Sequence, residues 1–342
     1  MSPRVTAVML AYGAEPYLPE AARAVLASTG VDVDLVLVDN GCTTDGVDVV
    51  KGLPGARVLR PARNTGYAGG CRVGAAEATG DVLVFVNSDA IVAPGALASL
   101  AAAVADPAVG GAMASVRLAS DPDLINTAGN PLHFMGLSWA GGNGSPATRF
   151  ATRRPVPSLS GCCFAIRREL WVELDGFAEE YFAYHEDTEL SLRLWQRGLR
   201  AEYIPDAVAV HHYEFSRNAL KQYLVERNRL ITLFTAYQAG TLTVLAPMIV
   251  VTEGALLVAS LLGGWSGPKV RGWGWLWRNR AWLRARRAHL RRERTVPDAA
   301  LAHLMTATVD PSNVEAPPGI GAYNVLARLY WRAARPLLPR RL

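Results

Sequence analysis

Short apolar runs alternate with helix-like stretches in residues 1–120. The runs are rich in β-branched residues, which predicts strands, whereas the Ala-rich stretches 17–28 and 95–105 predict helices. Because the apolar runs are continuous, we expect strands buried on both faces, as in an α/β fold with a mostly parallel sheet flanked by helices. The predicted strands are 5–12, 34–39, 57–60, 81–87 and 111–117.

The pattern becomes irregular in residues 121–157, which are rich in Gly, Asn and Pro. We interpret this stretch as a long excursion that shapes a binding site. Regular structure returns with a predicted helix at 188–196, closed by Gly198, and a strand at 201–204. A charged, helix-like stretch at 216–236 then leads away from this region.

Residues 240–264 are almost wholly apolar, interrupted by Pro247 and Glu253. Their number suffices to cross a bilayer, although a charged Glu near the middle costs about 3 kcal/mol. The Arg- and Trp-rich block 269–294 follows; Arg is attracted to anionic head groups, and Trp prefers the membrane interface. Three interpretations stay open: a membrane span, an interfacial or re-entrant hairpin, and a buried core hairpin with a solvated basic face.

The net charge of +5 is unevenly distributed along the chain. Residues 269–294 hold ten Lys or Arg against Glu293 alone, so the rest of the chain is net acidic. Nucleic-acid-binding proteins usually spread positive charge over a face or stripe that meets the backbone. A single basic block beside an apolar segment therefore argues against nucleic acid as a partner and favours a membrane surface.

The cysteines and the N-terminus bear on the cellular compartment. Cys42, Cys71, Cys162 and Cys163 lack metal-binding spacing, so we expect reduced thiols. The chain runs from Met1 into the first predicted strand without an apolar signal segment, which favours the cytoplasm for the region of the predicted sheet. We therefore expect the protein at the cytoplasmic face of the cell membrane, either peripheral or held by one hydrophobic segment.

The first candidate for chemistry is Asn87-Ser88-Asp89, which follows the predicted strand 81–87. Ligands bind beyond the carboxyl ends of strands in open α/β sheets, so Asp89 lies where a carboxylate can hold Mg²⁺ or Mn²⁺ against phosphate oxygens. An Asp in this place is also a common turn former or helix cap, and Pro94 makes that alternative reasonable.

A second candidate is His185-Glu186-Asp187-Thr188-Glu189, with Arg193 one helical turn further on. The helix dipole favours acidic residues in a first turn, and Glu189 can pair with Arg193 at i, i+4. These effects explain one or two carboxylates. A cluster of three is costly unless some of them act as ligand, base or hydrogen-bond anchor.

The third candidate is the Gly-rich loop of residues 64–70, followed by Arg72. Glycines allow close approach of the backbone to a ligand, and a helix N-terminus with an Arg favours a diphosphate. The loop comes later in the chain than the Gly-rich loop of dinucleotide-binding folds, which follows the first strand.

Together these motifs resemble the family 2 glycosyltransferases, inverting enzymes of the GT-A fold, and in particular their bacterial rhamnosyltransferase-like branch. The resemblance spans residues 4–235. It rests on the order and spacing of Val8-Met9-Leu10-Ala11-Tyr12 with Glu15, Val38-Asp39-Asn40, Asn64-Thr65-Gly66-Tyr67-Ala68-Gly69-Gly70, Asn87-Ser88-Asp89, Ser160-Gly161, Gly176-Phe177 and Glu186-Asp187.

The resemblance implies a role for each motif. Asp187 would be the general base, Glu186 would bind the acceptor, and Asp89 would hold a divalent cation, Mn²⁺ or Mg²⁺. Asn87 stands where the family often has a second carboxylate, and His211 is a candidate further metal ligand, with His212 beside it. The implied donor-binding residues are Ala11, Tyr12, Glu15, Asp39, Asn64, Gly69, Arg72, Asn87 and Ser88.

The implied activity is transfer of a sugar, with rhamnose favoured, to a hydroxyl of a lipid-linked glycan in bacterial cell-envelope polysaccharide synthesis. The donor is a dTDP-, UDP- or GDP-linked sugar. We expect a GT-A catalytic domain at 1–215, with its donor half at about 1–120 and its acceptor half at about 121–215, then a membrane-associating helical region at 216–296 and a peripheral tail at 297–342. Two alternatives are a catalytically weak or inactive nucleotide-sugar-binding membrane scaffold and another nucleotide-dependent enzyme on a doubly wound sheet. The oligomeric state is left open.

Overall fold

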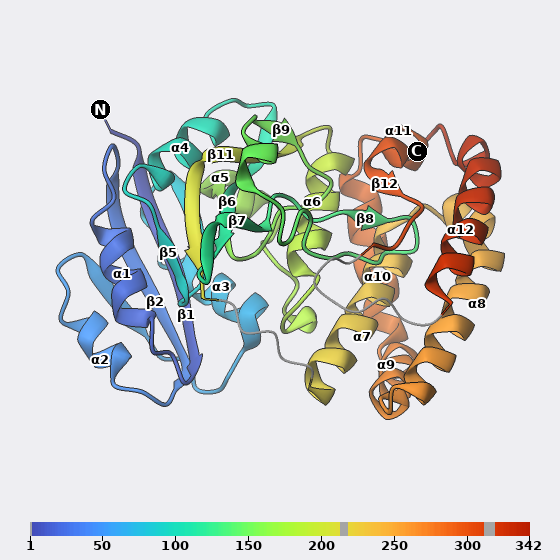
Figure 1. Ribbon diagram of the computed structural model, residues 1–342, viewed down its shortest axis with the longest axis horizontal. Coiled ribbons are helices and arrows are strands. Elements are labelled where there is room, and N and C mark those ends of the chain that lie inside the picture. Colours follow the sequence, from blue (N-terminus) through green and yellow to red (C-terminus); the bar gives the residue numbers. More distant parts are fainter. Residues whose placement is uncertain (1, 213–217, 311–318) are drawn as a thin grey trace.

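A large mixed sheet and a group of C-terminal helices make up the molecule (Figure 1). The computed structural model describes residues 2–212, 218–310 and 319–342. The strand order is β3-β2-β1-β4-β10-β6-β11-β5, with β7 beside β6 and β9 beside β11. The α/β class and the C-terminal helical extension are confirmed.

The first half of the sheet is parallel, because its strands are joined by helical crossovers. The strand β4 is buried along its whole length, as its continuous apolar run predicts. The elements are β1 Arg4–Gly13, α1 Leu18–Leu26, β2 Asp32–Cys42, α2 Gly46–Lys51, β3 Ala56–Leu59, α3 Gly66–Ala76 and β4 Val82–Val86.

The second half of the sheet is mixed. Strand β10 runs antiparallel between β4 and β6, whereas β11 pairs parallel with β6. The strands are β5 Ala90–Val92, β6 Val109–Leu118, β7 Asp121–Thr127, β9 Arg154–Pro155, β10 Cys163–Arg167 and β11 Arg200–His211. The helices are α4 Ala96–Val104, η1 Ala147–Phe150, α5 Arg168–Glu173, η2 Glu179–Tyr181 and α6 Glu186–Gln196.

A second hydrophobic core lies among the C-terminal helices and includes Leu132 and Phe134 from the irregular excursion. Trp331 stacks on Phe134 with ring centroids 4.7 Å apart, so part of 297–342, expected as a peripheral tail, is packed into this core. Its elements are α7 Ala219–Ala236, α8 Ala239–Leu262, α9 Ser266–Arg278, α10 Arg280–Glu293, α11 Asp298–Leu301, η3 Ala302–Leu304, α12 Ile320–Ala334 and η4 Arg335–Leu337, with β8 Leu132–His133 parallel to β12 Met305–Thr306.

The apolar stretch forms α8, a single helix that continues through Pro247, so 240–264 is not itself a hairpin. It is long and apolar enough to cross a membrane, but length and composition alone do not distinguish a span from other settings. Its Glu253 forms ion pairs with Arg229 and Lys269 and accepts a 2.7 Å hydrogen bond from Trp273 Nε1. These partners offset the cost of a carboxylate in an apolar helix.

Candidate functional site

The loops after β1 and β4 meet at the carboxyl edge of the sheet. Glu15 accepts a hydrogen bond from the backbone N–H of Tyr12 at 3.3 Å and interacts with the Ser88 hydroxyl. Burial raises the pKa of Glu15, and the nearby negative charge of Asp89 adds to the rise. The structure thus brings together Glu15, Ser88 and Asp89, three of the residues singled out from the sequence.

Asp89 lies beside the end of β11, where its Oδ1 is 3.1 Å from His211 Nε2. His211 is buried, and its Nδ1 is 3.0 Å from Asn126 Oδ1. If Nδ1 carries the proton, this contact orients the ring and leaves the Nε2 lone pair facing Asp89, as in metal-binding histidines whose other ring nitrogen donates to an oxygen. The pair brings one carboxylate and one imidazole into the same site.

The donor set around Asp89 is small. Among the described residues, no group of three or more His, Cys, Asp and Glu is arranged to hold a metal ion. Mg²⁺ commonly uses only one or two protein carboxylates and takes its other ligands from water and substrate phosphates. Asp89 and His211 therefore fit a cation that is completed by a diphosphate, and not a closed structural metal site.

His212 takes a different place from His211. Its ring stacks on Tyr17 with centroids 3.7 Å apart, and its backbone N–H donates to the Asp89 carbonyl at 2.9 Å. The stack ties the end of β11 to α1, next to the loop that carries Glu15. The side chain and the backbone of His212 therefore both help to hold the loops around Asp89 in place.

Asp39 lies at the end of β2, where it forms a polar corner. Partial burial alone would raise its pKa, but hydrogen bonds from the backbone N–H groups of Cys42 and Gly41, and from Arg60, hold it below its usual value. Its neighbour Asn40 is buried and donates to the Gly66 carbonyl at 2.9 Å. The end of β2 is thus tied to the Gly-rich loop.

The Gly-rich loop packs, through its first glycine, against the segment that precedes α6. Gly66 has φ +70°, and a Cβ there would lie 2.3 Å from the Phe182 carbonyl oxygen, so only glycine fits. Asn64 accepts a 2.8 Å bond from the Gly66 N–H. Gly69, by contrast, is buried against Thr65 within its own helix.

Arg72, Ala11 and Tyr12, also singled out from the sequence, make few side-chain contacts with the residues described above. Arg72 is paired with Asp175 at 3.0 Å and with Glu179 at 3.4 Å, so acidic side chains already occupy its guanidinium. Ala11 is fully buried and Tyr12 is 63% exposed beside it. The structure thus presents Tyr12 to solvent and Arg72 to the segment after α5.

Glu186 and Asp187 form the first turn of α6. Asp187 Oδ2 accepts a 3.0 Å hydrogen bond from the Gly161 N–H, and Oδ1 accepts one of 2.7 Å from the Thr188 N–H. Burial nevertheless raises the pKa of Asp187. Burial and the charge of Asp187 also raise the pKa of Glu186 well above its usual value, and Glu186 Oε2 has no hydrogen-bond partner among the described residues.

The backbone before α6 is strained. Phe182, Tyr184 and His185 have φ between +63° and +70°, a region that costs non-glycine residues about 1 kcal/mol or more each. His185 is buried, and burial lowers its pKa to about 4. Strain of this kind persists only where neighbouring structure holds the backbone.

Two residues that the sequence did not single out hold this strained segment. Asn228 is fully buried, and its Nδ2 donates to the carbonyls of Tyr181, Ala183 and Tyr184 at 2.7–2.8 Å. Arg227 donates to the carbonyls of Glu180 and Tyr181 at 2.6 and 2.9 Å. The run of four polar residues at 226–229, between apolar residues of the same helix, is the signal in the sequence that could have drawn attention to them.

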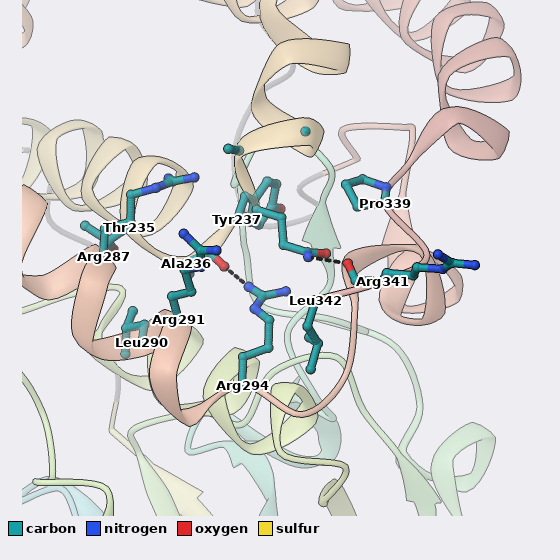
Figure 2. A pocket seen from close by; sticks show the side chains of 13 residues that line it. Thr235, Ala236, Tyr237, Arg287, Leu290, Arg291, Arg294, Pro339, Arg341 and Leu342 are labelled. Carbon is teal, nitrogen blue, oxygen red and sulfur yellow. Dashed lines mark hydrogen bonds between the residues drawn. The ribbon is translucent and has the colours of Figure 1, made fainter.

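A cavity of about 550 Å³ lies away from the carboxyl edge, between the end of α7, the start of α8, α10 and the C-terminal residues 339–342 (Figure 2). Two of its arginines have structural partners: Arg287 donates to the Phe234 carbonyl and Arg294 to that of Ala236. They therefore cap the last turn of α7, where carbonyl groups lack partners within the helix. Arg294 is further paired with Asp298.

Comparison with known proteins identifies relatives over the sheet. The chain matches the model of glycosyl transferase family 2 over residues 6–174 and that of the N-terminal domain of galactosyltransferase over residues 145–216. An N-acetylglucosaminyl-diphospho-decaprenol L-rhamnosyltransferase of Mycobacterium tuberculosis is 29% identical over 232 residues, which cover 60% of this chain and 75% of that protein. The O-antigen biosynthesis protein RfbC of Myxococcus xanthus is 30% identical over 42% of this chain and 12% of its own length.

Solved structures resemble the fold. GalNAc-T7 with UDP, GalNAc and Mn²⁺ superposes with a TM-score of 0.57 at 18% identity, over 72% of this chain and 50% of that one. The mannosyltransferase PcManGT from Pyrobaculum calidifontis, in complex with GDP-Man and Mn²⁺, gives 0.51 at 18% identity, over 98% and 86%. At this identity the likeness concerns the fold alone.

Proposed function

Since the chain belongs to the family 2 glycosyltransferases, in the rhamnosyltransferase-like branch, we propose that it transfers a sugar from a nucleotide-diphosphate donor to a hydroxyl with inversion at the anomeric carbon. One observation carries the proposal. Asp187, a carboxylate with a raised pKa in the first turn of α6, accepts a hydrogen bond from the N–H of Gly161, and the Gly161 carbonyl in turn accepts one from the Tyr67 hydroxyl of the Gly-rich loop.

Asp187 would act as the general base. Inversion requires the acceptor oxygen to attack the anomeric carbon opposite the departing diphosphate while its proton leaves. The raised pKa makes Asp187 a stronger base than an ordinary carboxylate, and its hydrogen bonds from Gly161 and Thr188 fix its orientation. Glu186, buried beside it with an unpartnered oxygen, would bind a hydroxyl of the acceptor.

Asp89 and His211 would hold a divalent cation, Mn²⁺ or Mg²⁺. When bound, the ion would neutralise negative charge on the leaving diphosphate. The 3.1 Å contact between Asp89 and His211, with Asn126 behind the imidazole, supports this assignment. The Mn²⁺ named with GalNAc-T7 and PcManGT also supports a cation of this kind.

The donor would lie along the carboxyl edge of β1, β2 and β4. Asp39 would accept hydrogen bonds from the nucleobase, and Tyr12 would pack against it. The proposed donor-binding residues are Ala11, Tyr12, Glu15, Asp39, Asn64, Gly69, Arg72, Asn87 and Ser88. Arg72 and Gly69 need rearrangement for this role, since Arg72 is ion-paired and Gly69 is buried.

For the acceptor we propose a lipid-linked glycan at the cytoplasmic face of a bacterial membrane, in cell-envelope polysaccharide synthesis. The mycobacterial relative, whose name specifies a decaprenol-linked GlcNAc acceptor and rhamnose as the sugar, supports both the acceptor class and rhamnose. Four free cysteines fit a reducing compartment. The apolar helix α8 fits attachment to a membrane.

A donor screen tests the proposal. Purified protein with Mn²⁺ or Mg²⁺ is mixed with dTDP-, UDP- and GDP-linked sugars, and released nucleoside diphosphate is measured with and without a GlcNAc-diphosphate-lipid acceptor. Acceptor-dependent release that needs the cation and is lost in Asp187→Asn supports the function. Nucleotide binding without release from any donor would favour the membrane scaffold instead.

A further inference from the structure

The helix α8 places its polar and apolar residues on the opposite sides from a surface helix of a soluble protein. Its exposed residues recur at helical spacing on one side, and none of these exposed residues is charged from one end of the helix to the other. The polar residues Thr252, Glu253 and Ser260 face the protein interior instead. Water does not favour this arrangement, because it buries polar groups and exposes apolar ones. The outward stripe is Thr243, Ala246, Pro247, Val250, Val251, Gly254, Ala255, Val258, Leu261 and Leu262.

The helix α12 extends this surface. Its exposed side divides into an apolar stripe, Val325, Leu326 and Leu329, and an adjacent basic stripe of Arg328 and Arg332, which Arg335 continues directly after the helix. Tyr323 and Tyr330 hydrogen-bond α8, at Thr252 Oγ1 and the Val244 carbonyl.

These tyrosines fix which stripe of α12 adjoins α8. At helical spacing, Tyr323 and Tyr330 lie next to the apolar stripe and away from the basic one. The apolar faces of the two helices therefore adjoin, with the arginines along the outer edge. Figure 1 shows α8 and α12 together at the side of the molecule opposite the sheet.

We propose that the outward faces of α8 and α12, here named the α8–α12 face, form a monotopic docking surface for a bilayer that contains anionic lipids. The uncharged stripe supplies apolar area for the acyl boundary, and the arginine edge supplies charge for the head groups. The proposal rests on the proposed function only for its purpose, which is to keep the active site near a lipid-linked acceptor.

The buried ion network argues that α8 lies in the plane of the membrane and does not cross it. Glu253, at mid-helix, is joined through Arg229 and Lys269 to Glu226, with Lys269 Nζ 2.7 Å from Glu226 Oε2. Arg229 belongs to α7, and Asn228 of the same helix holds the strained backbone before α6. A spanning α8 would carry this network into the hydrocarbon or break it, and either is costly.

Vesicle flotation of the full chain tests the surface. The double variant Val250→Glu with Val258→Glu places charges on two outward positions that are 73% and 56% exposed, so folding should be unaffected. We expect binding to vesicles of equal parts phosphatidylcholine and phosphatidylglycerol to fall about tenfold or more. Val172→Glu, at a 66% exposed valine on α5, is the matched control and should bind like the wild type.

Three outcomes would overturn the docking proposal. They are vesicle binding unchanged in the double variant, wild-type binding that is no stronger to phosphatidylglycerol vesicles than to pure phosphatidylcholine, and a dimer in light scattering that the double variant dissolves. The last outcome would assign the face to a second copy of the chain. Nucleotide release from a donor without vesicles is measured in parallel. If the wild type releases nucleotide and the double variant binds vesicles as well as the wild type does, the docking proposal fails and the proposed function stands. If vesicle binding falls in the double variant but the wild type releases no nucleotide from any donor, the docking proposal stands and the proposed function fails.

Depth measurements separate in-plane docking from a span. A fluorophore sensitive to polarity is attached at Thr243→Cys, Val251→Cys or Leu261→Cys, each in a Cys42→Ser background because the other three cysteines are buried. In-plane docking predicts the same shallow depth at all three positions. A probe at 251 that lies deep in the bilayer while those at 243 and 261 lie at its surfaces would contradict the proposal.

Discussion

Glu186 in α6 and Glu226 in α7 are buried to nearly the same extent, with 5% and 7% of their surfaces exposed, yet their pKa values shift in opposite directions. Burial and the charge of Asp187 raise the pKa of Glu186. Burial also disfavours charge on Glu226, but Arg229 and Lys269 overcome it and lower its pKa. Burial alone therefore does not decide the state of a carboxylate; its partners do.

The contrast assigns different tasks to the two clusters. Glu226 and Glu253, the carboxylates of the ion network between α7, α8 and α9, are paired with basic side chains and join these three helices. Among the described residues no basic side chain forms an ion pair with Glu186 or Asp187, and the two carboxylates are held at the sheet edge at a cost in stability, as is common at catalytic sites. The following predictions test this division.

Asp187→Asn should give the largest effect. The amide still accepts the Gly161 N–H but cannot take a proton, so turnover should fall about 10³-fold while nucleotide binding is retained. Steady-state kinetics and calorimetric titration of nucleoside diphosphate measure the two quantities. In the wild type, activity should decline as pH falls through the raised pKa of Asp187, above the usual range of a carboxyl. Turnover that survives in the variant would remove Asp187 from the role of base.

Glu253→Ala should destabilise the protein by about 3 kcal/mol, because Arg229 and Lys269 lose a shared partner in a buried setting. Urea unfolding at neutral pH measures the free energy of unfolding. The lowered pKa means that this contribution is present above the ordinary carboxyl pKa and disappears as pH falls through the folded value. An unchanged unfolding midpoint would mean that the network is not a structural join.

Asp89→Asn and His211→Ala should each lower cation-dependent turnover about 10²-fold. The expected signature is a higher Mn²⁺ concentration for half-maximal activity, measured by titration of the ion. Asp106→Asn, at an exposed carboxylate paired with Arg200, serves as the control and should leave the titration unchanged. Equal Mn²⁺ curves for wild type and both site variants would exclude these residues as ligands.

Asn228→Ala should lower kcat about tenfold with little change in the KM for the donor, because the backbone before α6 loses its three amide hydrogen bonds. Asn324→Ala loses two hydrogen bonds to the backbone of Val309, among the C-terminal helices, and is the matched control. The two variants distinguish loss of positioning from general loss of stability. Equal kcat in both would show that Asn228 has no positioning role.

Glu186→Gln should have the smallest effect on folding, a stabilisation of about 1 kcal/mol at neutral pH. The folded protein holds the proton of Glu186 more tightly than the unfolded chain, so the free energy of unfolding falls as pH rises above the ordinary carboxyl value. The gain should therefore vanish near pH 4, as measured by thermal unfolding at both pH values. A gain of equal size at both would reveal a cause other than ionisation.

The sequence predicts the elements that have a strong period or a continuous apolar run. Strands β1, β2 and β6 and helices α1, α4 and α6 lie within a few residues of their predicted places. It missed β10, since Cys163–Arg167 is a short run that resembles a buried helix segment equally well. The antiparallel direction of β10 depends on pairing between distant segments, which no local pattern encodes.

The candidate site divides in the same way. Motifs beside strand ends led to Glu15, Ser88, Asp89 and His211, which the fold brings together. Asn228 was missed because a buried polar residue inside a helix looks like a surface residue until its partners are known. The cost of Glu253 was predicted, but not its partners Arg229 and Lys269, which come from two other helices.

The anomeric configuration of the product tests the central claim most directly. With the donor and acceptor that the screen selects, NMR of the first product formed gives its one-bond C1–H1 coupling, which is compared with that of the donor because the H1–H2 coupling of a sugar such as rhamnose is small in both anomers. A single displacement with Asp187 as base predicts a product of opposite configuration to the donor. Retention of configuration would contradict the account.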